Sequence, residues 1–126
     1  DTIDYVTIAS TGNATDFGNL TVAKSSLGAV ANSTRFLAAG GSTGSPTNVI
    51  EYVTIATPGN GTDFGDLTTT NSITGNGLTN ETRGVFGGYG GPSNLMDYIT
   101  IATPGNATDF GDLTLARYRV GCLSGD

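Results

Sequence analysis

Apolar and polar positions alternate in three short stretches of this chain that have almost the same sequence, at residues 4–9, 51–56 and 97–102. In the third stretch, Ile99 and Ile101 fall on one side of an extended chain, and Tyr98 and Thr100 fall on the other. This period of two is typical of a β-strand. A second shared segment follows each stretch, at residues 12–21, 59–68 and 105–114. The pattern predicts three β-hairpins of the same design.

The hairpins recur at a nearly constant interval. Tyr5, Tyr52 and Tyr98 are 47 and 46 residues apart, and Phe17, Phe64 and Phe110 give the same intervals. A fixed period of this length indicates a repeat architecture such as a solenoid or a propeller. Residues present in every copy mostly build the copy, so we expect individual function where the copies differ.

The hairpin sequence predicts two local features. Pro104 followed by Gly105 is typical of a type II turn, in which the glycine has a positive φ. Phe110 and Leu113 are three positions apart, so a regular strand would place them on opposite faces. A bulge at Gly111 would bring both onto the same face.

The segments between the hairpins predict two further strands in each repeat. Residues 34–41 and 82–88 read as short strands that end in a Gly-Gly pair, and weaker strands are expected at residues 27–31 and 73–78. Four antiparallel strands in about 47 residues, without helical periodicity, match one blade of a β-propeller. A β-helix is the main alternative, although it would show shorter coils and ladders of stacked residues. The propeller interpretation predicts that the repeated Tyr and Phe side chains are buried between blades.

The repeat resembles the kelch family. Gly87-Gly88, Tyr98, Phe110 and Arg117 follow the kelch order of a Gly-Gly strand end, a tyrosine, an aromatic residue and a basic residue. The preceding copy keeps this order but has Asn71 at the basic position, and Phe stands where kelch repeats usually have Trp. The wording of the hairpin also resembles repeat segments of structural and fibre-like proteins of tailed phages, especially marine ones.

The kelch order implies an all-β chain of kelch-like propeller blades that forms an incomplete ring. Residues 1–24 would be the outer hairpin of a partial blade, 25–71 and 72–117 would be blades, and 118–126 would begin another. Propellers close with about four to eight blades. We therefore expect the remaining strands to come from the rest of a longer polypeptide, our first choice, or from neighbouring chains. A start at Asp1 rather than Met agrees with a processed chain or a piece of a longer product.

Composition and charge exclude several classes of partner. The chain has 20 Gly, no Trp and no His, and its net charge is −6 with five basic residues. Nucleic-acid binding requires a basic stripe that this chain lacks, so we expect no nucleic-acid partner. No apolar run reaches the roughly 18–20 residues of a membrane span, so we expect no membrane insertion. Cys122 is the single cysteine, so no disulfide can form within the chain.

Candidate chemistry is sparse. Without histidine the common nucleophilic triads are absent, and we interpret the repeated hairpin acids as turn or surface residues. Asn106, Asp109 and Asp112 could offer oxygen ligands to Ca²⁺, but their spacing fits neither an EF-hand loop nor a nonapeptide repeat. We expect no catalytic residue, no cofactor and no metal. Six Asn-x-Ser/Thr sequons occur, and we favour no modification; the asparagines are Asn13, Asn19, Asn32, Asn60, Asn80 and Asn106.

Two other groups of residues suggest contacts. Arg35 and Arg83 precede the Gly-Gly strands, and we predict that they bridge neighbouring blades. The loops after Gly-Gly differ most between copies, and variable loops on a repeat scaffold are common binding sites. We expect Tyr89 to be exposed there. The predicted ligand-contact residues are Ser42, Thr43, Ser45, Asn48, Tyr89, Ser93 and Asn94.

These observations favour a structural or interaction module over an enzyme. The phage resemblance implies part of a virion appendage or tail-fibre-like assembly, acting as a scaffold or as the element that contacts the host. The alternative is a lectin-like propeller that is secreted or displayed on a cell surface. In either setting a host-surface glycan or receptor is a possible partner.

Overall fold

A computed structural model describes residues 1–70 and 77–124, and within them the chain is all-β. Its strands form three antiparallel sheets. The first sheet consists of β1 (Thr2–Tyr5) and β2 (Thr15–Asn19). The second consists of β3 (Gly28–Ala31), β4 (Arg35–Ala39), β5 (Val49–Thr54) and β6 (Thr62–Asp66). The third consists of β7 (Gly77–Thr79), β8 (Arg83–Gly87), β9 (Ser93–Thr100) and β10 (Thr108–Arg117).

In both four-stranded sheets each strand pairs with the one before it in sequence. The prediction of four short antiparallel strands in a repeat, and of no helix, is confirmed for the described residues. Residues 71–76 lie outside the described residues. Most of the predicted strand at 73–78, the predicted boundary at 71/72 and Asn71 at the basic position therefore also lie outside them.

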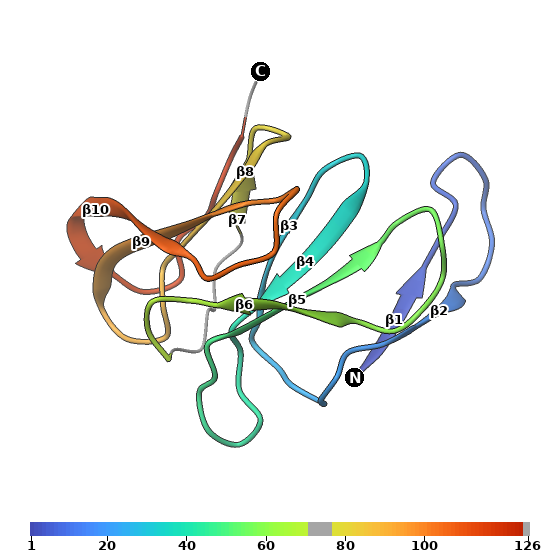
Figure 1. Ribbon diagram of the computed structural model, residues 1–126, viewed down its shortest axis with the longest axis horizontal. Coiled ribbons are helices and arrows are strands. Elements are labelled where there is room, and N and C mark those ends of the chain that lie inside the picture. The colour runs from blue at the N-terminus through green and yellow to red at the C-terminus, as the bar shows by residue number, and fades with distance from the viewer. Residues whose placement is uncertain (71–76, 125–126) are drawn as a thin grey trace.

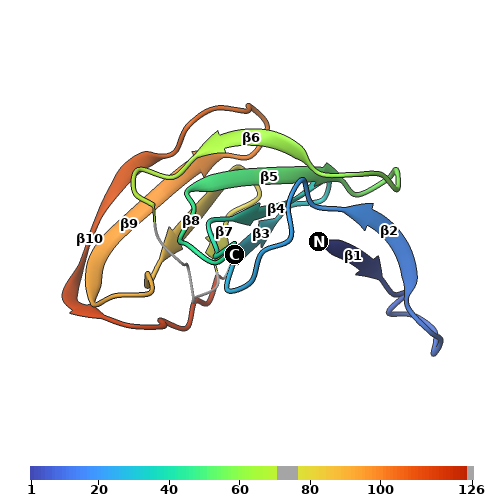
Figure 2. The same ribbon diagram turned by 90° about the horizontal axis from the view of Figure 1, so that it is seen from below.

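The three sheets lie side by side and diverge from the middle of the molecule, an arrangement that we call the fan (Figure 1). Figure 2 shows β2, β6 and β10 along the outer edge of the fan, while β3 and β7 lie near its middle. At the middle β3 contacts both β7 and β8. Equivalent strands therefore occupy equivalent distances from the centre of the molecule.

One hydrophobic core runs through the second and third sheets. It includes Leu37, Ile50 and Phe64 from the second sheet, and Phe86 and Ile101 from the third. Burying an apolar side chain of this size stabilises a protein by about 1.5–3 kcal/mol. The shared core therefore holds these two sheets together as one unit.

The predicted type II turn at Pro104-Gly105 is wrong. The chain reverses earlier, where the Thr103 N–H donates to the Thr100 carbonyl at 3.0 Å. Gly105 is not among the glycines with positive φ. Its N–H instead donates to the Phe64 carbonyl at 2.7 Å, so contact with the neighbouring sheet draws the Pro-Gly segment along β6.

The predicted bulge at Gly111 is confirmed. The pairing of β10 with β9 shifts register between Asp109 and Gly111, and Gly111 has a φ of 130°. The other two hairpins shift at the same point. In the second sheet the bulge brings Phe64 and Leu67 into the core together.

The prediction that all six repeated aromatic rings are buried is only partly correct. Each Tyr packs edge-on against the Phe of its own hairpin, with ring centroids about 6 Å apart. Phe17 and Phe64 are buried, and Tyr52 and Tyr98 are half-buried. Tyr5 and Phe110 are 44% and 48% exposed: the sheet that contains Tyr5 has only two strands, and no described sheet follows the one that contains Phe110.

Candidate functional site

The predicted ligand-contact residues occupy two different kinds of structure. Ser42, Thr43, Ser45 and Asn48 lie in the loop between β4 and β5, where the Ser42 hydroxyl accepts a hydrogen bond from the Gly44 N–H at 3.3 Å. Thr43 and Ser45 are exposed and remain available for contact. Ser93 and Asn94, in contrast, begin β9.

The prediction that Tyr89 is exposed is wrong. Its side chain is fully buried, and its hydroxyl donates to Asp97 Oδ2 at 2.5 Å. Burial first, and then the hydrogen bond to the Asp97 carboxylate and its negative charge, raise the pKa of Tyr89 well above its ordinary value. The flanking glycines suggested a flexible loop, but the phenol packs beneath it as a partner for a buried acid.

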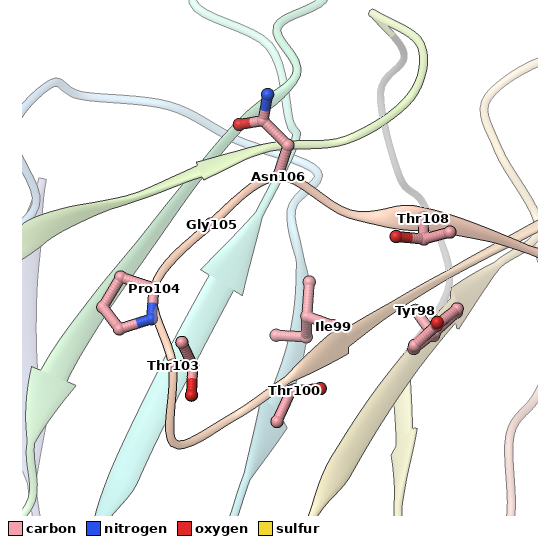
Figure 3. A pocket seen from close by; sticks show the side chains of 8 residues that line it. All are labelled: Tyr98, Ile99, Thr100, Thr103, Pro104, Gly105, Asn106 and Thr108. Carbon is pink, nitrogen blue, oxygen red and sulfur yellow. The ribbon is translucent and has the colours of Figure 1, made fainter.

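Each hairpin encloses a shallow concavity between its turn and its two strands. The largest, of about 330 Å³, is lined by residues including Tyr98, Thr100, Thr103 and Pro104 (Figure 3). The hairpins of the second and first sheets enclose equivalent concavities of about 290 and 120 Å³. None of the predicted ligand-contact residues lines these three hairpin pockets.

The tyrosine of the hairpin pocket already has protein partners. The Arg83 guanidinium lies over the Tyr98 ring, 5.0 Å from its centroid, and Phe110 packs against the ring edge-on. Arg35 lies over Tyr52 in the same way, at 4.6 Å. An arginine therefore lies over one face of this tyrosine in both sheets.

A second repeated arrangement, which we call the joint, connects each sheet to the next. Its first part is a pair of backbone hydrogen bonds. The Gly105 and Ala107 N–H groups donate to the Phe64 and Asp66 carbonyls, each at 2.7 Å. The Asn106 side chain extends away from its own hairpin toward β6 (Figure 3), and its oxygen accepts the Asp66 N–H at 3.1 Å. The loop of the third sheet thus continues the hydrogen bonding of the second.

A glycine makes this close approach possible. A Cβ on Gly65 would overlap the backbone of Gly105 and Asn106, and Gly65 has a φ of 144° that side chains disfavour. The first and second sheets repeat the contact. There Gly18 faces Gly59, the Asn60 side chain accepts the Asn19 N–H at 3.0 Å, and the Gly61 N–H donates to the Asn19 carbonyl at 2.7 Å.

The second part of the joint is a buried carboxylate. Asp97 on β9 accepts hydrogen bonds from the Thr68 N–H at 3.1 Å and from the Thr68 hydroxyl at 2.7 Å. Glu51 on β5 does the same for the N–H and hydroxyl of Thr21. Both acids are almost completely buried, so each depends on these donors to offset its lost hydration.

The two carboxylates differ in their third partner. Asp97 receives the Tyr89 hydroxyl, whereas Glu51 forms a buried ion pair with Lys24 at 2.8 Å. Burial alone would raise the pKa of Glu51, but the hydrogen bonds from Lys24 and Thr21 outweigh it and hold that pKa below its ordinary value of 4.5. Glu51 is therefore charged at neutral pH.

Arg35 supplies a third part of the joint. Its Nη1 donates to the Ile101 carbonyl at 2.8 Å, which connects β4 of the second sheet to the end of β9 in the third. The prediction that Arg35 bridges neighbouring repeats is confirmed as a contact between sheets. Arg83 is exposed and lies over Tyr98 of its own sheet.

The described residues show no grouping that suggests a metal centre, since no three His, Cys, Asp or Glu side chains converge among them. Asn106, considered above as a calcium ligand, binds the backbone of β6 instead. Asp109 accepts a hydrogen bond from the Gly111 N–H at 3.0 Å, in agreement with the turn interpretation of the hairpin acids. Residues 1–70 and 77–124 also contain no helix with the length and hydropathy needed to cross a bilayer.

The acids of the joint are visible in the sequence, although no role was predicted for them. The signal was an acid recurring in the middle of an apolar strand, at Asp4, Glu51 and Asp97. An acid is disfavoured there unless it has a buried partner. Its donors lie about 30 residues away in sequence, so spacing alone did not connect them.

Comparisons with known proteins leave the family open. No protein-family model matches the chain. No curated protein matches its sequence significantly.

Proposed function

We propose that this chain is a structural repeat module, a scaffold whose four-stranded sheets are the blades of a kelch-like β-propeller. One observation carries the proposal. The first and second sheets are joined by the same loop-to-bulge contact and the same carboxylate–threonine contact as the second and third. A joint that is used twice in one chain provides a general rule for adding units side by side.

The arrangement of strands supports a radial rather than a linear array. The first strands of the second and third sheets lie in the middle of the fan, and the last strands lie at its edge (Figure 2). A propeller places its blades in this way around a central axis. In this proposal the remaining blades come from a longer polypeptide or from neighbouring chains.

The setting that we propose is a virion appendage or a tail-fibre-like assembly. It rests on the resemblance of the repeat to phage structural proteins, together with a chain whose repeated residues serve packing. Cryo-electron microscopy of the native assembly tests the architecture: sheets should radiate from one axis, with β3 and β7 innermost. Sheets stacked along a line would contradict the propeller. Immunogold labelling of virions with an antibody against the chain tests the setting, and label found only on soluble protein would contradict it.

A second candidate function is carbohydrate binding by the hairpin pockets. The observation that favours it is a pocket repeated in every hairpin, lined by a tyrosine, threonine hydroxyls and an asparagine. A glycan array with the intact chain tests it. Binding that is lost in a Thr103→Val, Thr57→Val double variant, and kept in a Thr43→Val control, would support a lectin-like role. An array without signal would contradict carbohydrate binding and leave the scaffold as the proposed function.

A further inference from the structure

Two surfaces at opposite ends of the fan are the unoccupied halves of the joint described above. The loop face consists of Asp4, Val6, Ile8, Gly12 and Asn13. The bulge face consists of Arg83, Phe110, Gly111, Asp112, Leu113 and Thr114. We propose that the loop face of one copy of this chain docks on the bulge face of a second copy and reproduces the joint between the second and third sheets. This deepens the proposed scaffold function, on which it rests, by naming the partner.

The bulge face has the same sequence as the occupied half of the existing joint. Phe-Gly-Asp-Leu-Thr stands at residues 64–68 and again at 110–114. Phe64 is 3% exposed beneath the third sheet, whereas Phe110 is 48% exposed. A Cβ on Gly111 would meet nothing within 4 Å, although the same position on Gly65 is filled by Gly105. The bulge glycine of the third sheet is therefore open to a loop like the one that fills Gly65.

The loop face matches the other half of the joint. Gly-Asn-Ala-Thr stands at residues 12–15 and again at 105–108. In the third sheet, whose loop already contacts the second sheet, Ile99 and Ile101 are 2% and 0% exposed. The corresponding Val6 and Ile8 of the first sheet are 57% and 96% exposed. An apolar strand face and its loop are thus presented together, with no neighbouring sheet among the described residues.

The polar groups of the two faces also correspond. Asp4 aligns with Asp97 and makes no side-chain hydrogen bond or ion pair with the described residues, so it can accept the Thr114 N–H and hydroxyl as Asp97 accepts those of Thr68. Asn13 can accept the Asp112 N–H, as Asn106 accepts that of Asp66. These pairings leave each buried polar group of the new joint with a partner.

Arg83 adds a third pairing. It aligns with Arg35, which donates to the Ile101 carbonyl, and the matching carbonyl on the loop face is that of Ile8. The two faces are different surfaces on one molecule, so the contact is head-to-tail and every copy can use both faces. Repetition of the contact gives a ring where the rotation closes.

The test uses variants that each disable one face. Asp4→Ala, Asn13→Ala together remove the polar contacts of the loop face, and Gly111→Ala blocks the bulge face. The controls are Asp16→Ala, which removes an exposed acid from the same hairpin, and Gly44→Ala, at another open glycine with positive φ (104°). Sedimentation velocity should show concentration-dependent association of the wild type. Each face variant should weaken it by at least about tenfold, equivalent to about 1.4 kcal/mol, while the controls should not.

Mixing the two face variants gives the decisive result. Each variant retains one good face, so the mixture should form a one-to-one dimer and nothing larger. If circular dichroism shows that Gly111→Ala is unfolded, Thr114→Val serves as the bulge-face variant. A wild type that stays monomeric at about 100 μM, controls as damaging as the face variants, or a mixture without a dimer would each overturn the docking of a second copy. None of these results bears on the radial arrangement of the sheets, which the density of the native assembly tests separately.

Discussion

At the residue scale, the most informative side chains are the buried acids, Glu51 and Asp97. Each lies on an inner strand of its sheet and takes hydrogen bonds from a threonine just after the last strand of the preceding sheet. A buried carboxylate without donors costs several kcal/mol, so these acids make correct seating of the next sheet a condition for stability. Their role is to specify how sheets align, while apolar burial supplies most of the favourable free energy.

The hydrogen bond from Tyr89 to Asp97 gives the first prediction. Tyr89→Phe keeps the ring but removes the hydroxyl from a buried carboxylate, so we expect the free energy of unfolding to fall by about 1.5–3 kcal/mol. Tyr118→Phe, at an exposed tyrosine, should change it by less than about 0.5 kcal/mol. Urea denaturation of both variants measures the difference. Equal effects would mean that the buried bond contributes nothing.

The lowered pKa of Glu51 gives the second prediction. A carboxyl group whose pKa is lower in the folded state stabilises that state above its ordinary pKa of 4.5, and this contribution is lost as the pH falls through the folded value. Glu51→Gln should therefore be less stable than the wild type at neutral pH, and the difference should shrink below pH 4.5. Thermal unfolding across that range measures it. Thr70→Ala, which removes no titrating group, should keep a constant difference.

At the element scale, the hairpin does more than connect two strands. Its bulge glycine opens one side to the loop of the next sheet, and its own loop fills the bulge of the sheet before. A hairpin with both features can be added repeatedly without a change of sequence. This explains why the Gly-Asn of the loop and the Phe-Gly of the bulge recur in all copies.

The bulge glycine gives the third prediction. Gly65→Ala, at a φ of 144°, adds a methyl group that overlaps the Gly105 backbone, whereas Gly44→Ala, at a φ of 104°, adds one in open space. Both variants bear the strain of the backbone conformation, so their difference isolates the joint. We expect Gly65→Ala to be less stable by a further 1–3 kcal/mol or so, within the range typical of overpacking. Differential scanning calorimetry measures both, and equal melting temperatures would exclude close packing at this bulge.

At the scale of the whole molecule, the second and third sheets share one core while apolar residues remain exposed at both ends of the fan. Repeat proteins are stabilised by the interfaces between their units, so an uncovered end unit is less stable than an inner one. The protein is therefore expected to associate or aggregate when it is purified alone. A monodisperse monomer that melts cooperatively would contradict this expectation.

The net charge gives the fourth prediction. Copies that each carry a charge of −6 repel one another over a distance set by the ionic strength. Raising salt from about 0.01 M to about 0.15 M shortens the screening length from about 30 Å to about 8 Å. Association of copies should therefore become tighter as salt rises, which sedimentation at the two ionic strengths measures. Weaker association at high salt would indicate that attraction between opposite charges drives it.

The sequence pattern was enough to predict the approximate positions of the strands, their number in each repeat and the bulge at Gly111, although the strands predicted at 4–9, 51–56 and 97–102 end earlier, at Tyr5, Thr54 and Thr100. These features depend on alternation, on turn residues and on one glycine, all of which act within a few residues of the chain. Repetition added the comparison between copies. It made the acid on the first strand of each hairpin and the Gly-Asn of the loop visible as shared positions.

The roles of those shared positions depend on contacts between sheets. The turn lies at Thr100–Thr103 rather than at Pro104-Gly105, because Gly105 bonds to a different sheet. The Tyr89 ring packs into the core with its hydroxyl on Asp97, and Phe110 is exposed because no described sheet follows its own. In each case the deciding partner lies on another strand or sheet. Local sequence propensity contains no information about a hydrogen bond or a buried surface whose other half is supplied by a distant part of the chain.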